Sequence, residues 1–139
     1  MTFKDFRSAI EKQLNSHCYE IKYPKNHNEN FFWITVKGTN IGNDVCHYEF
    51  VKDENSNAAD EMYKINLEIH YEFDNADKYI PKLFNRILGK PIEPRFKNES
   101  SSQIGIVYKQ FNSSDSNLIR DCINSLEEMD RKYQEKFIN

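Results

Sequence analysis

Residues 63–73 have the sequence YKINLEIHYEF, and this stretch decides the fold. Apolar and polar side chains alternate along it without interruption, the apolar set being Tyr63, Ile65, Leu67, Ile69, Tyr71 and Phe73. Alternation with a period of two is typical of a β-strand that has one face in a core and one face in water. Antiparallel sheets contain strands of this kind, so the pattern predicts an antiparallel sheet that is covered on one side only.

The sequence around this strand predicts the other elements. Thr2 and Asp5 have the spacing of a capping box, and the apolar residues that follow recur at helical spacing. We expect helices over residues 3–15, 77–88 and 115–136 and further strands over residues 17–23, 31–37, 45–51 and 103–111. Residues 92–102 contain Pro94 and end in three serines in a row, and we expect them to be irregular.

These elements predict an α+β fold in a single domain over residues 1–139. The expected architecture is an antiparallel sheet of four to five strands with helices packed on one face, in the order α-(β)-β-β-β-α-β-α. The expected core consists of apolar residues on the inner faces, namely Phe6, Ile10, Ile34, Val36, Ile65, Leu67, Ile69, Leu83, Ile87, Ile106, Ile123 and Leu126.

The composition is that of a globular protein that does not enter membranes. Of 139 residues, 38% are hydrophobic and 29% are charged, with only four glycines and four prolines. No apolar run approaches the roughly 20 residues needed to span a bilayer, and the first residues lead into no apolar signal segment. The chain has three cysteines, and so small and odd a number does not suit a disulfide framework. We therefore expect a cytoplasmic protein.

Charge is segregated along the chain. Residues 44–77 carry ten acidic side chains against two lysines, a net charge of −8, whereas residues 78–97 carry a net charge of +5. Such separation predicts two partner-binding surfaces. The acidic one comprises Asp53, Glu54, Asp60 and Glu61. The basic one runs along the expected second helix and the segment after it, and comprises Lys78, Lys82, Arg86, Lys90, Arg95 and Lys97. The alternative is an ordinary solvated helix face.

Metal-ligand chemistry is present on the polar face of the strand over residues 63–73. Glu68, His70 and Glu72 alternate along that face, and imidazole and carboxylate groups are ligands for zinc or manganese. Three ligands on one straight strand converge poorly, although His47 on the preceding strand could help. We favour a solvated polar face, and we expect no metal ion and no cofactor.

The cysteines offer two further candidates. His17 and Cys18, with Cys46 and His47, have the composition of a zinc quartet, but neighbours in a strand point to opposite faces and chelate poorly. Half-buried cysteines are the favoured interpretation, and Cys122 is expected in the core. A nucleophilic pair of cysteine and histidine remains an alternative, since such partners meet only in the fold.

The later part of the chain resembles a bacterial domain family of unknown function. The resemblance is carried by the sequence GKPIEPRF at residues 89–96, by residues 101–104, and by the closing helix pattern Ile123, Leu126, Met129, Tyr133 and Phe137. In that family a helix ends in a Gly-x-Pro turn, and a strand and an aromatic-rich helix follow. Its members are often attached to nuclease-like domains, so the resemblance implies an accessory or recognition module. Pro94 and Gln103 depart from the family pattern.

The sequence contains no P-loop, GxGxxG, HExxH or GxSxG motif. We therefore favour a non-enzymatic protein-interaction module, of a bacterial or phage defence, counter-defence or toxin-neutralising system. One alternative is a nucleic-acid-binding accessory domain of a restriction-type nuclease system, using the basic surface. Another is a metal-dependent hydrolase using Glu68, His70 and Glu72. Homodimerisation is left open.

Overall fold

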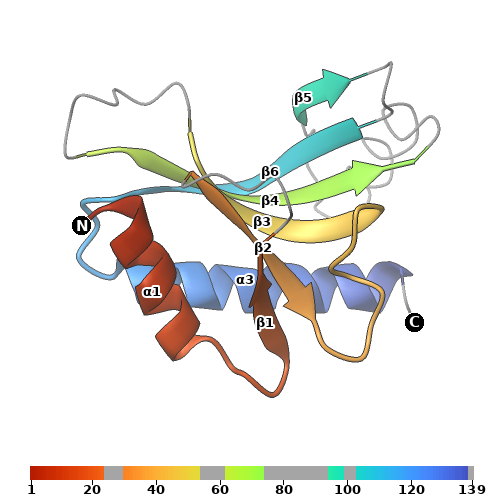
Figure 1. The fold of residues 1–139 in the computed structure, drawn as a ribbon, viewed down its shortest axis with the longest axis horizontal. Coiled ribbons are helices and arrows are strands. Elements are labelled where there is room, and N and C mark those ends of the chain that lie inside the picture. The colour runs from red at the N-terminus through yellow and green to blue at the C-terminus, as the bar shows by residue number, and fades with distance from the viewer. Residues whose placement is uncertain (24–29, 54–61, 74–93, 99–102, 138–139) are drawn as a thin grey trace.

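The computed structural model describes residues 1–23, 30–53, 62–73, 94–98 and 103–137. Two helices and six strands lie in these ranges (Figure 1). Their bounds are α1 Phe3–Gln13, β1 Tyr19–Lys22, β2 Phe31–Val36, β3 Cys46–Lys52, β4 Lys64–Glu72, β5 Pro94–Asn98, β6 Gln103–Asn112 and α3 Leu118–Phe137.

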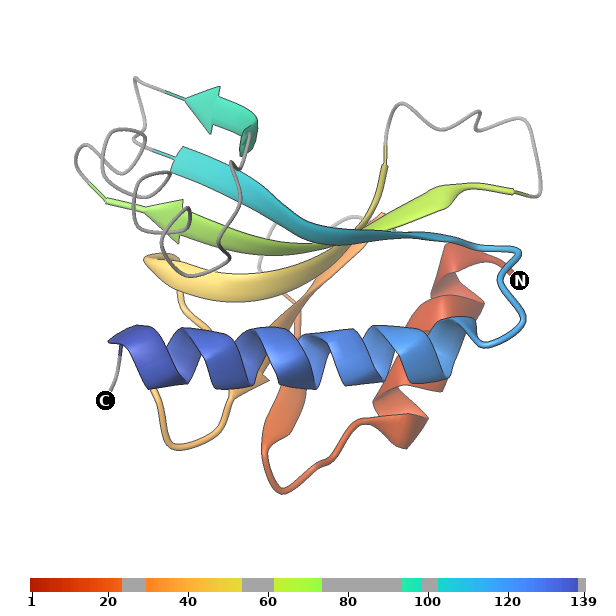
Figure 2. The same cartoon turned by 180° about the vertical axis from the view of Figure 1, so that it is seen from behind.

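All six strands belong to one antiparallel sheet with the order β1-β2-β3-β4-β6-β5. The helices α1 and α3 lie on the same side of this sheet (Figure 2). The predicted α+β class and the packing of helices on one face are therefore confirmed. The expectation of an irregular segment over residues 92–102 is wrong for β5, which pairs with the outer edge of β6. A proline at the first position of an edge strand is tolerated because no ladder partner needs its missing N–H group.

Helix α1 begins with the predicted capping box. Thr2 Oγ1 accepts a hydrogen bond from the backbone N–H of Asp5, and the Asp5 carboxylate accepts one from the backbone N–H of Thr2. These bonds satisfy two backbone donors at the helix start and lower the pKa of the Asp5 carboxyl. The apolar face of α1 then packs on the sheet through rings, with centroids 5.6 Å apart for Phe6 and Phe50 and 5.7 Å apart for Phe3 and Phe32.

Helix α3 is attached to the sheet by a buried carboxylate as well as by its apolar stripe. Asp130 accepts hydrogen bonds from the hydroxyl groups of Tyr19 on β1, at 2.8 Å, and Tyr48 on β3, at 2.7 Å. The amide of Gln134 donates to the same carboxylate. Burial, and then the neighbouring Asp130, raise the pKa of both tyrosine hydroxyls, so these groups remain protonated donors.

The pairing of β4 with β6 contains a β-bulge. Leu67 pairs with Lys109 and Glu68 pairs with Val107, so Tyr108 is an additional residue on β6. The hydroxyl of Tyr108 donates a hydrogen bond to Glu128 on α3, and this bond, followed by one from Lys132, lowers the pKa of the Glu128 carboxyl. The bulge thus coincides with a contact between the sheet and α3.

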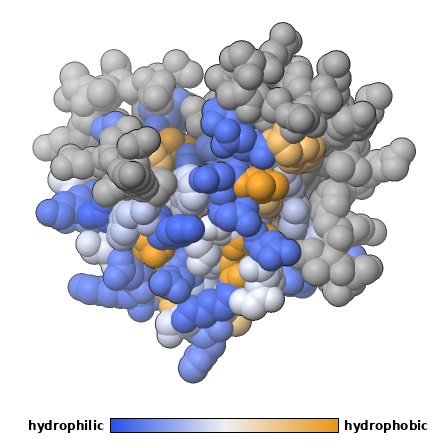
Figure 3. Space-filling view, turned by 45° about the vertical axis from the view of Figure 1, so that its right-hand side comes forward, coloured by the Kyte–Doolittle hydropathy of each residue, from blue (hydrophilic) through white to orange (hydrophobic). Residues whose placement is uncertain are grey.

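The second face of the sheet differs from the expected water-exposed one. Asn66 and Glu68, which were assigned to the exposed face of β4, are 1% and 0% exposed. The strong alternation of β4 therefore marks two buried faces, one apolar and one polar, and the prediction of a solvated face is wrong at these positions. On the face seen in Figure 3, hydrophobic residues show as small separate patches among hydrophilic ones.

The expected core is confirmed wherever the structure describes it. Ten of the twelve predicted core residues are buried, whereas Leu83 and Ile87, with the whole helix expected over 77–88, lie outside the described residues. Neither described helix combines the length and the apolar character needed to cross a bilayer.

Replacing Asp130 should destabilise the fold. The change Asp130→Ala leaves two buried tyrosine hydroxyl groups without their acceptor, so we expect the free energy of unfolding to fall by about 2–4 kcal/mol. Urea denaturation followed by circular dichroism measures the change. Glu127→Ala, at an exposed position of the same helix, is the matched control and should change it by less than about 0.5 kcal/mol. Equal effects of the two substitutions would contradict the assigned role of Asp130.

A candidate metal centre between two strands

The register of β3 and β4 brings four titratable side chains together. His47 pairs with His70, and Glu49 pairs with Glu68. Because alternate residues of a strand point to the same face, all four side chains lie on the face away from α1 and α3. The pairs that alternate with these two are Tyr48 with Ile69 and Phe50 with Leu67, and their side chains lie on the helix-covered face.

The four groups form a continuous series of short contacts. His47 Nε2 lies 3.5 Å from Glu49 Oε1, Glu49 Oε2 lies 3.3 Å from His70 Nε2, and His70 Nε2 lies 2.7 Å from Glu68 Oε1. His47, Glu49 and Glu68 are 6%, 5% and 0% exposed. Burial of two carboxylates is costly unless cations or hydrogen-bond donors face them, so this cluster is not an ordinary polar surface.

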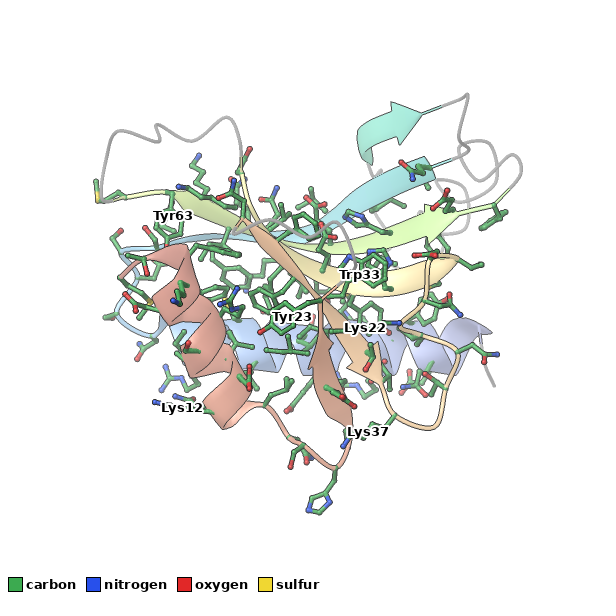
Figure 4. The ribbon with its side chains drawn as sticks, in the orientation of Figure 1. Lys12, Lys22, Tyr23, Trp33, Lys37 and Tyr63 are labelled. Carbon is green, nitrogen blue, oxygen red and sulfur yellow. The ribbon has the colours of Figure 1, made fainter. Side chains whose placement is uncertain are left out.

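The orientation of His47 is fixed by two contacts. Its Nδ1 lies 3.1 Å from the backbone carbonyl oxygen of Asn43, which can only accept, so Nδ1 carries the proton and donates it. Its ring stacks on Trp33 with centroids 3.7 Å apart. Lys22 Nζ lies 5.9 Å from the ring centroid of Trp33 (Figure 4). The remaining nitrogen, Nε2, is buried and has no hydrogen-bond partner among the residues that the structure describes.

The carbonyl that orients His47 is itself held by a tight connection between β2 and β3. The side chain of Asn43 accepts hydrogen bonds from the backbone N–H groups of Val45 and Cys46. Gly42, immediately before it, has φ +139°, and a Cβ at this position would lie 2.6 Å from the side chain of Thr35. The absence of a side chain at residue 42 therefore places Asn43 beside His47.

A row of hydrogen bonds leads away from Glu68 along the same face. Glu68 Oε2 accepts from Asn66 Nδ2 at 3.0 Å, and Asn66 Oδ1 accepts from Gln110 Nε2 at 2.8 Å. Gln110 Nε2 also donates to Asp53 Oδ2 at 2.9 Å. The polar row is the set Glu68, Asn66, Gln110 and Asp53, and it joins the buried cluster to the end of β3.

The spacing of the cluster suits a tetrahedral ion. Zinc binds imidazole nitrogen and carboxylate oxygen at about 2.0–2.2 Å, so ligand atoms around a tetrahedral zinc lie about 3.3–3.5 Å apart. The 3.5 Å separation joins His47 Nε2 to Glu49 Oε1, and the 3.3 Å separation joins His70 Nε2 to Glu49 Oε2. One ligand atom from each of His47, Glu49 and His70 lies within 4.8 Å of the others. Small side-chain adjustments would bring His47 and His70 to a common ion.

The structure brings together some of the predicted ligands and adds one. Glu68 and His70 are in the cluster, and His47 supplies the help expected from the preceding strand. Glu72 lies two residues after His70 on β4, opposite Gln103, and is not one of the grouped ligands. Sequence analysis missed Glu49, although its position two residues after His47 on the same strand was a usable signal.

The cysteines take no part in the cluster. Cys18 is exposed, whereas Cys46 and Cys122 are buried. Burial raises the pKa of the Cys46 thiol and raises that of Cys122 to about 12, which disfavours the reactive thiolate. Cys46 shares the helix-covered face with Tyr133, whose hydroxyl lies 3.7 Å from its sulfur, and so points away from His47.

The predicted charged surfaces fall largely outside the described residues. Of the acidic surface only Asp53 is described, and it belongs to the polar row. The side chains of the whole basic surface lie outside the described residues, although the backbone of Arg95 and Lys97 forms part of β5. These surfaces therefore stay predictions.

Comparison with protein-family models, curated proteins and solved structures found no match. The resemblance of the later part of the chain to a family attached to nuclease-like domains thus stays a prediction. The functional argument rests on the geometry of the cluster.

Substitution of Gly42 should disturb the cluster as well as the fold. In Gly42→Ala the new methyl group would overlap Thr35, so we expect a loss of stability of about 2–3 kcal/mol and a displaced Asn43. The matched control is Gly38→Ala, where φ is also positive, at 78°, but no atom lies within 4 Å of the new Cβ. Thermal unfolding of both variants measures the difference. Equal losses would show that the contact with Thr35 is unimportant.

Proposed function

We propose that this protein binds a divalent transition-metal ion, with zinc as the preferred ion, between β3 and β4. The protein ligands are His47 Nε2, His70 Nε2 and the carboxylate of Glu49. The observation that carries the proposal is the state of His47 Nε2, which is buried, has no hydrogen-bond partner in the described part of the chain and lies 3.5 Å from Glu49 Oε1.

The electrostatics of this contact favour a cation. With its proton on Nδ1, His47 presents a lone pair at Nε2 toward a carboxylate oxygen. Two electron-rich atoms at this separation repel each other in a buried setting, where water screens charge poorly. A cation between them, either a second proton on His47 or a metal ion, replaces the repulsion by attraction. Two imidazoles and a carboxylate on adjacent strands favour the metal ion.

The donor set also selects among metal ions. Imidazole nitrogen suits zinc, copper, iron and nickel, whereas calcium and magnesium prefer sites made of oxygen atoms alone. The hydrogen bond from His47 Nδ1 to the Asn43 carbonyl is the arrangement that fixes the tautomer and ring orientation of metal-binding histidines. An ion at this position would also join β3 to β4 and so stabilise the centre of the sheet.

The functions expected from the sequence depend on other parts of the chain. The interaction module, the nucleic-acid-binding domain and the place in a defence system stay predictions, because the charged surfaces on which they depend lie mostly outside the described residues. The hydrolase hypothesis also stays a prediction. The proposed metal site shares one ligand with that hypothesis, His70, which lies 2.7 Å from Glu68, and it requires no reaction.

Zinc should stabilise the folded protein. At a free zinc concentration one hundred times the dissociation constant, binding to the folded state alone adds about 2.7 kcal/mol to the free energy of unfolding. Thermal unfolding measures the gain in stability, and isothermal titration calorimetry measures the dissociation constant. In His47→Phe the ring can still stack on Trp33 but the ligand nitrogen is removed, so we expect at least about tenfold weaker binding.

The matched control is His17→Ala, which removes an exposed histidine and should leave zinc binding unchanged. Trp33 gives an independent local readout, because it is the only tryptophan and stacks on His47. Copper or cobalt at the site should therefore quench tryptophan fluorescence in the wild type and much less in His47→Phe. No binding of zinc, copper or cobalt to the wild type would refute the proposal.

A further inference from the structure

The polar row connects the candidate metal ligands to a carboxylate at the end of β3. It begins at Glu68, whose Oε1 lies 2.7 Å from His70 Nε2, and ends at Asp53, which follows the last residue of β3. Three elements contribute to it, since Asn66 and Glu68 lie on β4, Gln110 on β6 and Asp53 after β3. Asn66 donates through its amide nitrogen and accepts through its amide oxygen, whereas Gln110 donates to both Asn66 and Asp53 through Nε2.

We infer that the polar row couples metal binding at His70 to Asp53, so that the orientation and partners of Asp53 influence metal affinity. This inference rests on the proposed function. It adds a regulatory element to the site, because Asp53 is the first residue of the acidic surface that the sequence predicts for a basic partner. A cationic group binding there would act on the ion through the row.

The first step of the coupling occurs at His70. In the metal-free protein a proton on Nε2 is shared with Glu68 Oε1. Metal binding requires the lone pair of that nitrogen, so the proton leaves Nε2 either for Nδ1 of the same ring or for solvent. Glu68 Oε1 then loses the donor and turns toward the ion or toward another donor.

The later steps follow from the amide groups. An amide presents an acceptor on one side and a donor on the other, so its orientation is fixed once both are engaged. Asn66 donates to Glu68 and accepts from Gln110, and a movement of Glu68 therefore changes the bond that Gln110 makes. Gln110 uses the same nitrogen for Asp53, so the change reaches that carboxylate.

Nuclear magnetic resonance of the side-chain amides tests the first half of the inference. Zinc is added to the wild-type protein while the resonances of Asn66 Nδ2 and Gln110 Nε2 are followed. We expect both to shift along the same titration curve as the ring resonances of His47. The Gln134 amide, which donates to Asp130 on the helix-covered side, is the internal control and should stay unchanged.

A variant that breaks the polar row distinguishes an effect passed along its hydrogen bonds from a direct effect of the ion's electric field. In Asn66→Ser, zinc should still bind and shift the His47 ring, whereas Gln110 should no longer respond. Asn66→Ala serves the same purpose if the serine variant does not fold. A Gln110 shift as large as in the wild type would overturn the inference, because it would show an effect of the field alone.

Reciprocity gives the second half of the test, since coupling between two sites acts in both directions. Asp53→Asn removes the charged acceptor of Gln110 and should weaken zinc binding about two- to fivefold. Glu72→Gln is the matched control, because it removes one carboxylate charge near His70 but outside the polar row. Equal weakening in both variants would overturn the inference.

The outcomes distinguish the two proposals. Zinc binding with unchanged Asn66 and Gln110 resonances would overturn the coupling and leave the metal site in place. No zinc binding to the wild type, seen as unchanged His47 ring resonances, would overturn the proposed function and the coupling together. Zinc binding with both shifts and with a selective effect of Asp53→Asn supports both.

Discussion

The pairing register of β3 against β4 is the constraint on which the rest of the structure depends. It joins seven residue pairs, and each pair contributes to one of two buried faces. On one face Phe50 and Leu67 carry the core to which α1 and α3 attach. On the other face His47 and His70 meet. A shift of one residue would exchange the two faces of one strand, placing carboxylates under the helices and aromatic rings in the polar cluster. Alternative registers are disfavoured because each one-residue shift would bury polar side chains among apolar ones.

The polar face is costly to build, and this cost argues that it has a purpose beyond folding. Removal of a carboxylate from water costs several kcal/mol, and an apolar replacement of a buried ion pair is often neutral or stabilising. Glu49 and Glu68 are nevertheless placed side by side at the centre of the sheet. Their neighbours supply hydrogen-bond donors and imidazole nitrogens in fixed orientations. A cluster of this kind is suited to holding a cation. Valine and isoleucine at the same positions would stabilise the sheet better.

Local patterns predicted the fold well because strands and helices follow from side-chain periodicity. The alternation at residues 63–73 located β4, and Thr2 with Asp5 located the start of α1. The predicted exposure of the second face was wrong, because periodicity separates apolar from polar side chains and contains no information on what covers the polar ones. Glu49 was missed for a related reason. Its partner across the sheet is Glu68, and a register between strands joined by a long connection is not encoded in either strand alone. The β5 strand was missed because it is short and begins at Pro94, and a proline counts against a strand prediction.

The bulge at Tyr108 has a consequence for the second half of β6. Before the bulge, Ile104 and Ile106 face the core, and a regular ladder would continue with Gln110 in the core and Phe111 outside it. The extra residue reverses this alternation, so Phe111 pairs with Ile65 in the core and Gln110 pairs with Asn66 on the polar face. Deletion of Tyr108 would remove the bulge and leave a regular ladder in which Gln110 and Phe111 keep their faces, so the deletion would cost only the hydroxyl that bonds Glu128 on α3. The bulge therefore lets two core residues that are five positions apart, Ile106 and Phe111, share one face, which an unbulged strand allows only at even spacings.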